Sequence, residues 1–598
     1  MIDANSEPSK SSPDRPQTSV DKSSIAAPND SPPSILILPL ELLSMIVVVI
    51  AEMEPPRTPV SSLERKNVRK ESDPCMRTRL WDRIVEGGSL GWIRLTHVCN
   101  LWRKYICENM PLLWASHIGC FRSPHALDEM LRRAGESTRL AVHSVSGDDD
   151  MGENPSPWAE FQSIISIWSA AECTDFKFRI RSLAVIDLLS VADVERDLLS
   201  SLLDELPGIQ VLEVHHLFID ESSFDDEDIF LKPGAPVIRT STLRELRFTN
   251  CFIPWTAPGL THFSLSLGHC SGLPNPILLD IITLIAPTIE ALELDYCLPG
   301  GLSEQTRDAY ALPRLRYLYL RDTDGCLNEF VRIIQHESLS LTKLDLTINP
   351  DTRHWRDTIG SSMKKALLLL RGDRPFNSMT AISADSEDNI FGSLHEHIRL
   401  EFSSARSDDF ELAIAIENTH DIGDGYSFCL AQMQDALGSI FPTIWHELML
   451  IDLNLPLWNH GDEAQRLLNR LTNIRELRIV NPVASSQTDS TTWDMSFLHP
   501  IFRTSRLDYL CVMQEAVWSS GMIGPYCSAV AERLRCAWLG PSADTAHRSS
   551  EERWPIAVLH LSLVNKEDIN VTEEALADVF SDIAERVEIR SSWTHSTS

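Results

Sequence analysis

Apolar positions in the first part of the chain recur at helical spacing. Residues 38–118 predict a small helical module whose first helix runs from Leu40 to about Glu52. A second helix is expected from about Gly91 to Ile106, and Pro111 ends this segment ahead of Leu112, Leu113 and Trp114. The apolar face of the second helix is formed by Leu95, Val98, Trp102 and Tyr105.

The start of this module needs to be distinguished from a membrane span. The stretch from Ile35 to Ala51 is 17 residues long and contains Pro39 and Glu41, so we expect a buried helix entered through Leu38 and Pro39 instead of a span. A Pro- and charge-rich insert at about 54–75 predicts an exposed loop. Its basic run at 65–70 is interpreted as a solvated loop, with a nuclear localisation signal as the alternative.

A different pattern appears beyond about residue 170. An apolar residue, Leu, Leu and then Asn or Cys recur with fixed spacing, and two successive steps are each 26 residues. The clean copies are Leu243-Leu246-Phe248-Cys251, Ile289-Leu292-Leu294-Cys297, Leu315-Leu318-Leu320-Thr323 and Leu341-Leu344-Leu346-Asn349, and looser copies begin at Ile209, Leu260, Ile474, Leu507 and Ile556.

Each copy predicts a short strand, and apolar helical stretches such as 278–285 precede several of them. Helix and strand repeated in this way indicate an α/β fold: an irregular leucine-rich-repeat-like solenoid of parallel strands with crossover helices. The Asn/Cys position is expected at the turn after the strand, where it can satisfy backbone groups. No copy is found at about 351–440, and the 222–240 segment, with its acidic run 225–228, is interpreted as a surface loop.

The residue between the two inward Leu positions of each strand projects from the other face of the sheet. This row mixes both charges with one aromatic residue, which suits a protein partner better than a polyanion. The alternative is a merely solvated face. The row of candidate substrate-binding residues is Glu213, Arg247, Ser264, Glu293, Tyr319, Asp345 and Arg478.

These patterns divide the chain into five parts. We expect a disordered Ser/Pro-rich tail at 1–34, with no secretory leader. The helical module follows at 35–118 with a loop insert at about 54–89, then a helical linker at 119–170, the repeat region at 171–590 and a flexible C-terminus at 591–598.

Composition limits the classes of partner and compartment. The formal charge of −32 argues against sequence-independent binding of nucleic acid and against an anionic membrane surface. The 13 cysteines form no C-x-x-C pair, which predicts reduced thiols and a cytoplasmic or nuclear location.

The sequence contains no specific catalytic, phosphate-binding or metal-binding motif. The pairs His395/His397 and His215/His216 are interpreted as ordinary surface or loop histidines, and Gly423 to Gly425 is too short for a phosphate loop. We therefore expect no cofactor, no metal ion and no enzymatic activity of the chain itself.

The helical module resembles an F-box. The resemblance is carried by Leu38-Pro39-Leu40-Glu41-Leu42-Leu43, Ile46 and the segment LGWIRLTHVCNLWRKYICENMPLLW from Leu90 to Trp114. The phrasing is similar to F-box-like proteins numerous in mushroom-forming fungi, in which a leucine-rich-repeat-like region follows the box.

The resemblance implies a substrate-recognition subunit of a Skp–cullin–F-box ubiquitin ligase. Its partners would be a Skp-type adaptor, a cullin bound through that adaptor, and a protein substrate. The alternative is a ligase-independent repeat scaffold, which predicts that Leu38, Pro39 and Trp102 are occluded. Adaptor contact would belong to Leu38, Pro39, Leu42, Ile46, Val98, Cys99, Trp102 and Trp114, some of which must instead hold the module together.

Overall fold

The structure is a computed structural model. It describes residues 38–57, 89–121, 124–145, 176–187, 206, 208–216, 237–267, 273–302, 309–335, 339–350, 355–370, 376–385, 396–404, 410–417, 425–454, 467–481, 498–504, 506–514, 523–539, 555–563 and 578–591. The predicted tail at 1–34, the basic run 65–70, the acidic run 225–228 and the last residues 592–598 lie outside the described residues.

One mixed but mostly parallel sheet of 16 strands dominates an α/β fold. The strand order is β1-β2-β3-β5-β7-β8-β9-β10-β13-β12-β11-β14-β15-β16-β17-β18. The strands are β1 Leu140–Val145, β2 Ile180–Asp187, β3 Val211–His216, β5 Glu245–Thr249, β7 His262–Ser266, β8 Ala291–Asp295, β9 Tyr317–Thr323, β10 Lys343–Asn349, β11 Ser378–Asp385, β12 Glu396–Ser403, β13 Leu412–Ile416, β14 Leu450–Asn454, β15 Glu476–Asn481, β16 Leu507–Gln514, β17 Ile556–Leu563 and β18 Ala584–Ser591.

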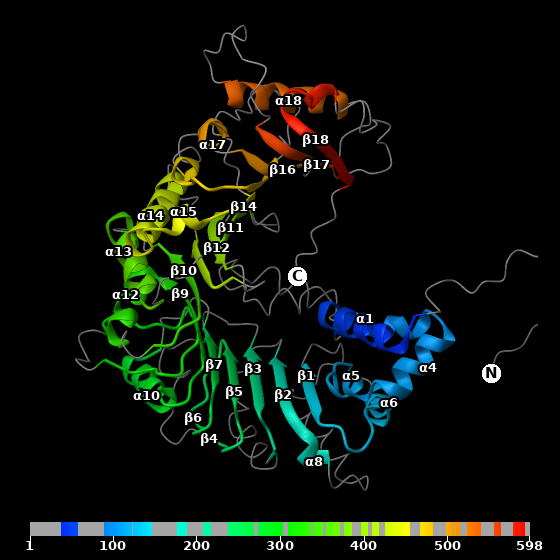
Figure 1. Cartoon of the computed structure of the whole chain (residues 1–598). Helices are drawn as coiled ribbons and strands as arrows, with labels where there is room; N and C mark the ends of the chain where they lie inside the picture. The colour runs from blue at the N-terminus through cyan, green and yellow to red at the C-terminus, as the bar shows by residue number, and fades with distance from the viewer. Residues whose placement is uncertain are drawn as a thin grey trace, which may run out of the picture.

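The sheet bends into an arc (Figure 1). Strands line its inner side and helices lie along its outer side. The helices of the arc are α10 Asn275–Ile285, α12 Asp324–Ile333, α13 Trp355–Leu367, α14 Gly425–Ile440, α15 Ile444–Glu447, α17 His499–Thr504 and α18 Ile523–Leu539. The short α8 Phe176–Arg179 precedes β2, and β4 Ile238–Arg239 pairs with β6 Trp255–Thr256 in a separate two-stranded sheet.

The strands expected from the repeated phrase are present, and neighbouring copies pair in parallel. Leu246, Phe263, Leu292, Leu318 and Leu344 occupy successive strands in direct register. All five side chains are buried. These residues form the core between the sheet and the outer helices, because alternate side chains of a strand point to one face.

The Asn/Cys position behaves partly as expected. The Cys251 thiol donates to the Val214 carbonyl, with 3.4 Å between Sγ and O. Thr323 caps α12, and its Oγ1 accepts from the Cys326 amide. Asn349 instead donates through Nδ2 to the Tyr296 hydroxyl, 3.3 Å away. The first two confirm that this position satisfies backbone groups.

The region where the phrase lapses contains the antiparallel strand of the sheet. Strands β11, β12 and β13 form a meander in which β12 is antiparallel to both neighbours. Strand β13 pairs with β10, and β11 pairs with β14, both in parallel. The chain therefore inserts a reversed strand here without changing the direction of the strands on either side.

Five short helices are described in the N-terminal helical module and directly after it. They are α1 Leu40–Met53, the 3₁₀-helix η3 Gly91–His97, α4 Asn100–Asn109, α5 Pro111–Ala115 and α6 Pro124–Ala134. The helix expected from Gly91 to Ile106 is thus broken, because Cys99 is extended at φ −158° and caps α4 by accepting from the Trp102 amide. Pro111 starts α5, where its missing N–H has no helical partner to lose.

The predicted linker at 119–170 is not entirely helical. After α6, β1 pairs with β2 and becomes the first strand of the sheet. Ile118 joins the module to this strand: its amide donates to Ala141, and its carbonyl accepts from His143. Long-range pairing of this kind leaves little trace in local propensity, so the strand was not expected.

Candidate functional site

The eight residues implied to contact an adaptor separate into exposed and buried groups. Trp102 is 4% exposed and Trp114 is 2% exposed. The Trp114 ring meets that of Trp92 edge to face at 4.8 Å between centroids, and its Nε1 donates to the Ile106 carbonyl over 3.0 Å. Both predicted tryptophans therefore hold the module together and cannot present their rings to a partner without rearrangement.

The other candidates lie at or near the surface. Val98 is 55% exposed, Leu42 is 46% exposed and Ile46 is 36% exposed. Pro39 is exposed at the start of α1, while Leu38 and Cys99 are half-buried. Occlusion of all three of Leu38, Pro39 and Trp102, expected for the scaffold alternative, is found only at Trp102.

Helix α1 buries one narrow stripe, Leu43, Val47 and Ala51, and leaves most of its apolar side chains in solvent. The expectation of a buried helix is therefore wrong. We call the exposed set the α1 surface: Leu40, Leu42, Met45, Ile46, Val48, Val49 and Met53. Exposed apolar area of this extent on one helix is uncommon in a monomeric protein.

Further exposed apolar residues of the module were missed by the sequence analysis. Leu112 is 73% exposed and Leu101 is 44% exposed. A hollow of about 750 Å³ lies between the module and the start of β1 and β2. Val48, Leu112 and Leu113 line it from the module, and Leu140 and Ala141 line it from β1. Helical periodicity shows that such residues share an apolar face. It does not show whether another segment of the chain covers that face.

Six of the seven candidate substrate-face residues lie side by side across six adjacent strands. Glu213 pairs in register with Arg247, Arg247 with Ser264, and Ser264 with Glu293. Tyr319 follows Glu293, and Asp345 follows Tyr319. The expected row is therefore present as one line across the inner side of the sheet.

The seventh residue, Arg478, is farther along the same line. Asp345 is opposite Ala413, and the register continues through three more strands to Arg478 on β15. The intermediate positions are Glu401, Thr380 and Asp452. The meander of β11 to β13 separates Arg478 from the other candidates.

Asp345 lies in the row but is not available to a partner. Its side chain is fully buried because Arg399 on β12 covers it in an ion pair. The Arg399 guanidinium also lies 5.2 Å from the Phe410 ring centroid. The expectation of a substrate-facing side chain is corrected here by a residue from the region without repeats.

The neighbouring part of the sheet contains a second polar cluster. Arg321 pairs with Glu417 over 2.9 Å, and the Tyr296 hydroxyl donates to the same carboxylate over 2.8 Å. Tyr296 has φ 48°, an uncommon value for a side chain of its size. Burial raises the pKa of Asp322 to about 7, against the hydrogen bonds from the Leu298 and Thr323 amides. Arg321, Glu417 and Tyr296 thus satisfy one another, while Asp322 is held by backbone amides.

The histidine pair His215/His216 is not on a surface loop. His215 lies on β3, is 4% exposed, and shares a 2.8 Å hydrogen bond between its Nδ1 and Thr249 Oγ1. His395 lies outside the described residues, as do the first two residues of 423–425. Within the described ranges, no group of three His, Cys, Asp or Glu side chains is arranged to hold a metal ion.

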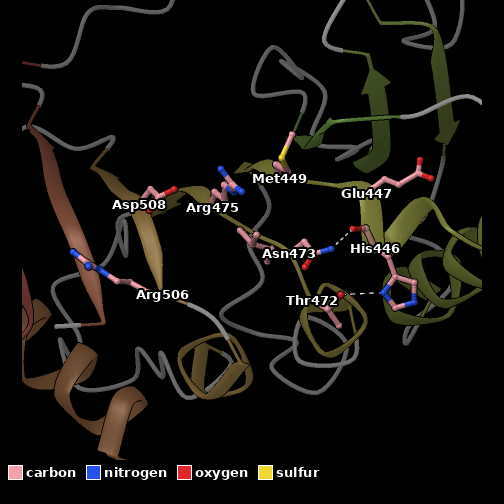
Figure 2. Close-up of a pocket in the computed structure, with 9 residues that line it drawn as sticks. His446, Glu447, Met449, Thr472, Asn473, Arg475, Arg506 and Asp508 are labelled. Carbon is pink, nitrogen blue, oxygen red and sulfur yellow. Dashed lines mark hydrogen bonds between the residues drawn. The ribbon is translucent and has the colours of Figure 1, made fainter. Parts of the chain in front are cut away.

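A polar groove of about 690 Å³, also missed by the sequence analysis, lies where β14, β15 and β16 begin (Figure 2). His446 Nδ1 is 3.0 Å from Thr472 Oγ1, and Asn473 Nδ2 donates to the His446 carbonyl over 2.6 Å. Figure 2 shows Asp508 beside Arg475, and Arg506 pairs with Glu585 over 2.7 Å. The charged side chains that line the groove are two arginines and two carboxylates, Arg475, Arg506, Glu447 and Asp508.

No protein-family model matches the chain, and no curated protein matches it either. Among the described helices, none has the length and apolar content that crossing a membrane requires.

Proposed function

We propose that the chain is the substrate-recognition subunit of a Skp–cullin–F-box ubiquitin ligase. In this proposal, residues 35–118 are an F-box that binds a Skp-type adaptor, and the arc of strands is a leucine-rich-repeat-like solenoid that binds a protein substrate. The chain would supply positioning and no chemistry of its own. The sequence resemblance to fungal F-box-like proteins motivates the assignment.

The exposed α1 surface is the observation that supports the proposal best. Leu42 and Ile46 lie one helical turn apart and are both exposed, although they belong to a helix with a separate buried stripe. Exposed apolar area on a small module is unfavourable in water unless a partner covers it. Helix α1 packs on η3, whose buried Trp92 contacts Trp114, so the module has a core of its own beside this surface.

Co-purification with a Skp-type adaptor tests the proposal. The paired variant Leu42→Ala/Ile46→Ala is expected to abolish capture, since each buried interface side chain contributes about 2 kcal/mol or more. The matched control is Leu368→Ala, whose side chain is 49% exposed and lies outside the module. The control should capture adaptor as the wild type does.

Circular dichroism of each variant accompanies the capture experiment. Substitutions of exposed residues should leave the spectrum and melting temperature within the range of surface mutations. If the folded double variant captures adaptor as well as the wild type does, the α1 surface is not the adaptor-binding face. If the wild type fails to capture adaptor, the ligase proposal is wrong. The ligase-independent scaffold would then be the better description.

A further inference from the structure

The inner side of the sheet carries a short polar row whose charges are not balanced. We call Glu213, Arg247, Ser264 and Glu293 the acidic row; they occupy β3, β5, β7 and β8 in direct register. Glu213, Ser264 and Glu293 are half-buried and Arg247 is exposed. The row is therefore reachable from the concave side while its carboxylates are partly removed from water.

Arg247 neutralises only part of this charge. Its Nε donates to Glu245 over 2.7 Å and lies 3.7 Å from a Glu213 oxygen. Burial favours the neutral form of Glu213, yet the neighbouring His215 and Arg247 outweigh it and lower the pKa of this carboxyl. Glu213 and Glu245 thus share one guanidinium.

Glu293 forms no ion pair within the described residues, and the charge of Arg247 acts on it only from two strands away. Its carboxylate makes no hydrogen bond or ion pair with any residue that the structure describes. Ser264 and Tyr319 flank it in the row on the two adjacent strands. A half-buried, unpaired carboxylate loses hydration without gaining a partner, so a cation brought by a ligand would be bound favourably.

A buried histidine lies beside Glu213 at the other end of the row. His215 is 4% exposed, and its Nε2 makes no hydrogen bond within the described structure. This nitrogen points toward the Glu213 carboxylate from 3.5 Å, and the opposite ring nitrogen is held by Thr249. His215 therefore faces Glu213 from within the protein, which leaves the outer side of this carboxylate to Arg247 and to a ligand.

The spacing of the carboxylates defines the ligand. Neighbouring strands are about 4.8 Å apart, so Glu213 and Glu293 are about 14 Å apart along the row. In an extended peptide, side chains on one side repeat every 6.7 Å or so, which places residues i and i+4 about 13 Å apart. The residue at i+2 then falls beside Arg247 and Ser264, where a basic side chain would be repelled.

We propose that the acidic row binds an extended segment of a protein partner with basic residues at i and i+4 and an acidic or hydroxyl residue at i+2. The segment crosses the strands, with one basic side chain on Glu213 and the other on Glu293. Arginine suits the second position, because its planar guanidinium can pair with Glu293 and stack on the ring of Tyr319. This inference rests on the proposed function in one respect: the basic segment is taken to belong to the protein substrate of the ligase.

The net charge of the chain agrees with a cationic partner. A formal charge of −32 attracts basic segments and repels nucleic acid. Elsewhere on the inner side, the carboxylates of Asp345 and Glu417 are paired with Arg399 and Arg321. Glu293 is distinguished from them because it has no arginine within ion-pair distance among the described residues.

Fluorescence anisotropy with synthetic peptides and the full chain, without adaptor, tests the proposal. One Gly/Ser peptide carries arginines at i and i+4 and glutamate at i+2. The second has the same composition with arginines at i and i+2 and glutamate at i+4. We expect the first to bind about tenfold more tightly, the ratio typical of one charge-assisted hydrogen bond.

Two variants locate the binding. Glu293→Gln should remove the difference between the peptides, while Glu532→Gln, at an exposed position on α18, should retain it. Equal affinity of the two peptides, no binding of either, or an unchanged ratio in Glu293→Gln would each overturn the inference. Circular dichroism of Glu293→Gln should match the wild type, since the replaced carboxylate makes no hydrogen bond or ion pair with the described residues.

The peptide result is independent of the adaptor experiment. A chain that distinguishes the peptides but captures no adaptor retains this inference and loses the ligase proposal. A chain that captures adaptor but does not distinguish the peptides retains the ligase proposal and loses this inference.

Discussion

Arg399 and Asp345 form a bidentate ion pair between the antiparallel meander and the parallel part of the sheet. Arg399 Nη1 lies 2.9 Å from Asp345 Oδ1, and Nη2 lies 3.1 Å from Oδ2. Arg399 belongs to the antiparallel strand β12 and Asp345 to the last strand before the meander, β10. The pair therefore joins the inserted meander to the parallel sheet.

Replacing Arg399 by Ala should destabilise the chain by about 3–5 kcal/mol, because it leaves the fully buried Asp345 carboxylate without a counter-ion. The double variant Arg399→Met/Asp345→Ala should recover much of this loss, since it removes both charges. Urea denaturation measures both. Equal destabilisation by the single and double variants would show that packing, not charge, accounts for the effect.

The two central tryptophans of the helical module are expected to respond differently to the same substitution. Trp114 Nε1 donates to the Ile106 carbonyl, whereas the buried Trp92 Nε1 has no hydrogen-bond partner among the described residues. Trp114→Phe should therefore cost about 1–2 kcal/mol more than Trp92→Phe, although both lose the same volume. Melting temperatures of the two variants provide the comparison, and equal values would contradict the assigned hydrogen bond.

Two glycines with positive φ provide a second matched pair. Gly91 (φ 51°) lies against the Glu54 carbonyl, so a Cβ there would overlap backbone, while a Cβ at Gly135 (φ 72°) would meet no atom within 4 Å. Gly135→Ala should cost about 1 kcal/mol from backbone strain alone. Gly91→Ala should cost about 2 kcal/mol more and should also loosen the junction of α1 with η3. Thermal unfolding of the two variants tests this prediction. A loss of stability in Gly91→Ala no larger than that in Gly135→Ala would contradict it.

Acid is expected to weaken the junction between the helical module and β1. Burial lowers the pKa of His117 to about 4, against a hydrogen bond to the Leu113 carbonyl and with a smaller lowering by His143. Burial also lowers the pKa of His143, against its contact with the Ser116 carbonyl. The two rings stack at 6.2 Å between centroids.

The folded-state pKa of His117 lies below its ordinary value of 6.5, so protonation favours the unfolded chain. Stability from this group is complete above pH 6.5 and is lost as the pH falls toward 4. Between pH 7 and pH 5 this group should lower the free energy of unfolding by about 2 kcal/mol. The glutamine of His117→Gln does not titrate. The free energy of unfolding of this variant, measured by urea denaturation at pH 7 and pH 5, should therefore fall by about 2 kcal/mol less than that of the wild type. An unchanged decrease would mean that other groups set the acid sensitivity.

The local patterns of the sequence predicted much of the secondary structure. The helix from Leu40 and the strands beginning near Leu246, Leu292, Leu318 and Leu344 are confirmed, because alternation and helical spacing depend only on which side chains share a face. The row from Glu213 to Tyr319 was predicted for the same reason: parallel strands with equal spacing place equivalent residues in register.

Other features depend on contacts between segments far apart in the sequence. The pattern of Val98 and Trp102 on one expected helix did not show that Val98 is exposed and Trp102 buried, because a break at Cys99 separates them. Similarly, Asp345 occupies a position equivalent to Glu293, but only Asp345 is covered by an arginine from β12.

The sequence by itself determined which residues are apolar, where most strands lie and which polar residues share the inner side of the sheet. The tertiary structure decided which of these residues remain accessible, because burial depends on the neighbouring segment as well as on the residue. The exposed α1 surface, the buried Asp345 and the unpaired Glu293 all follow from this dependence.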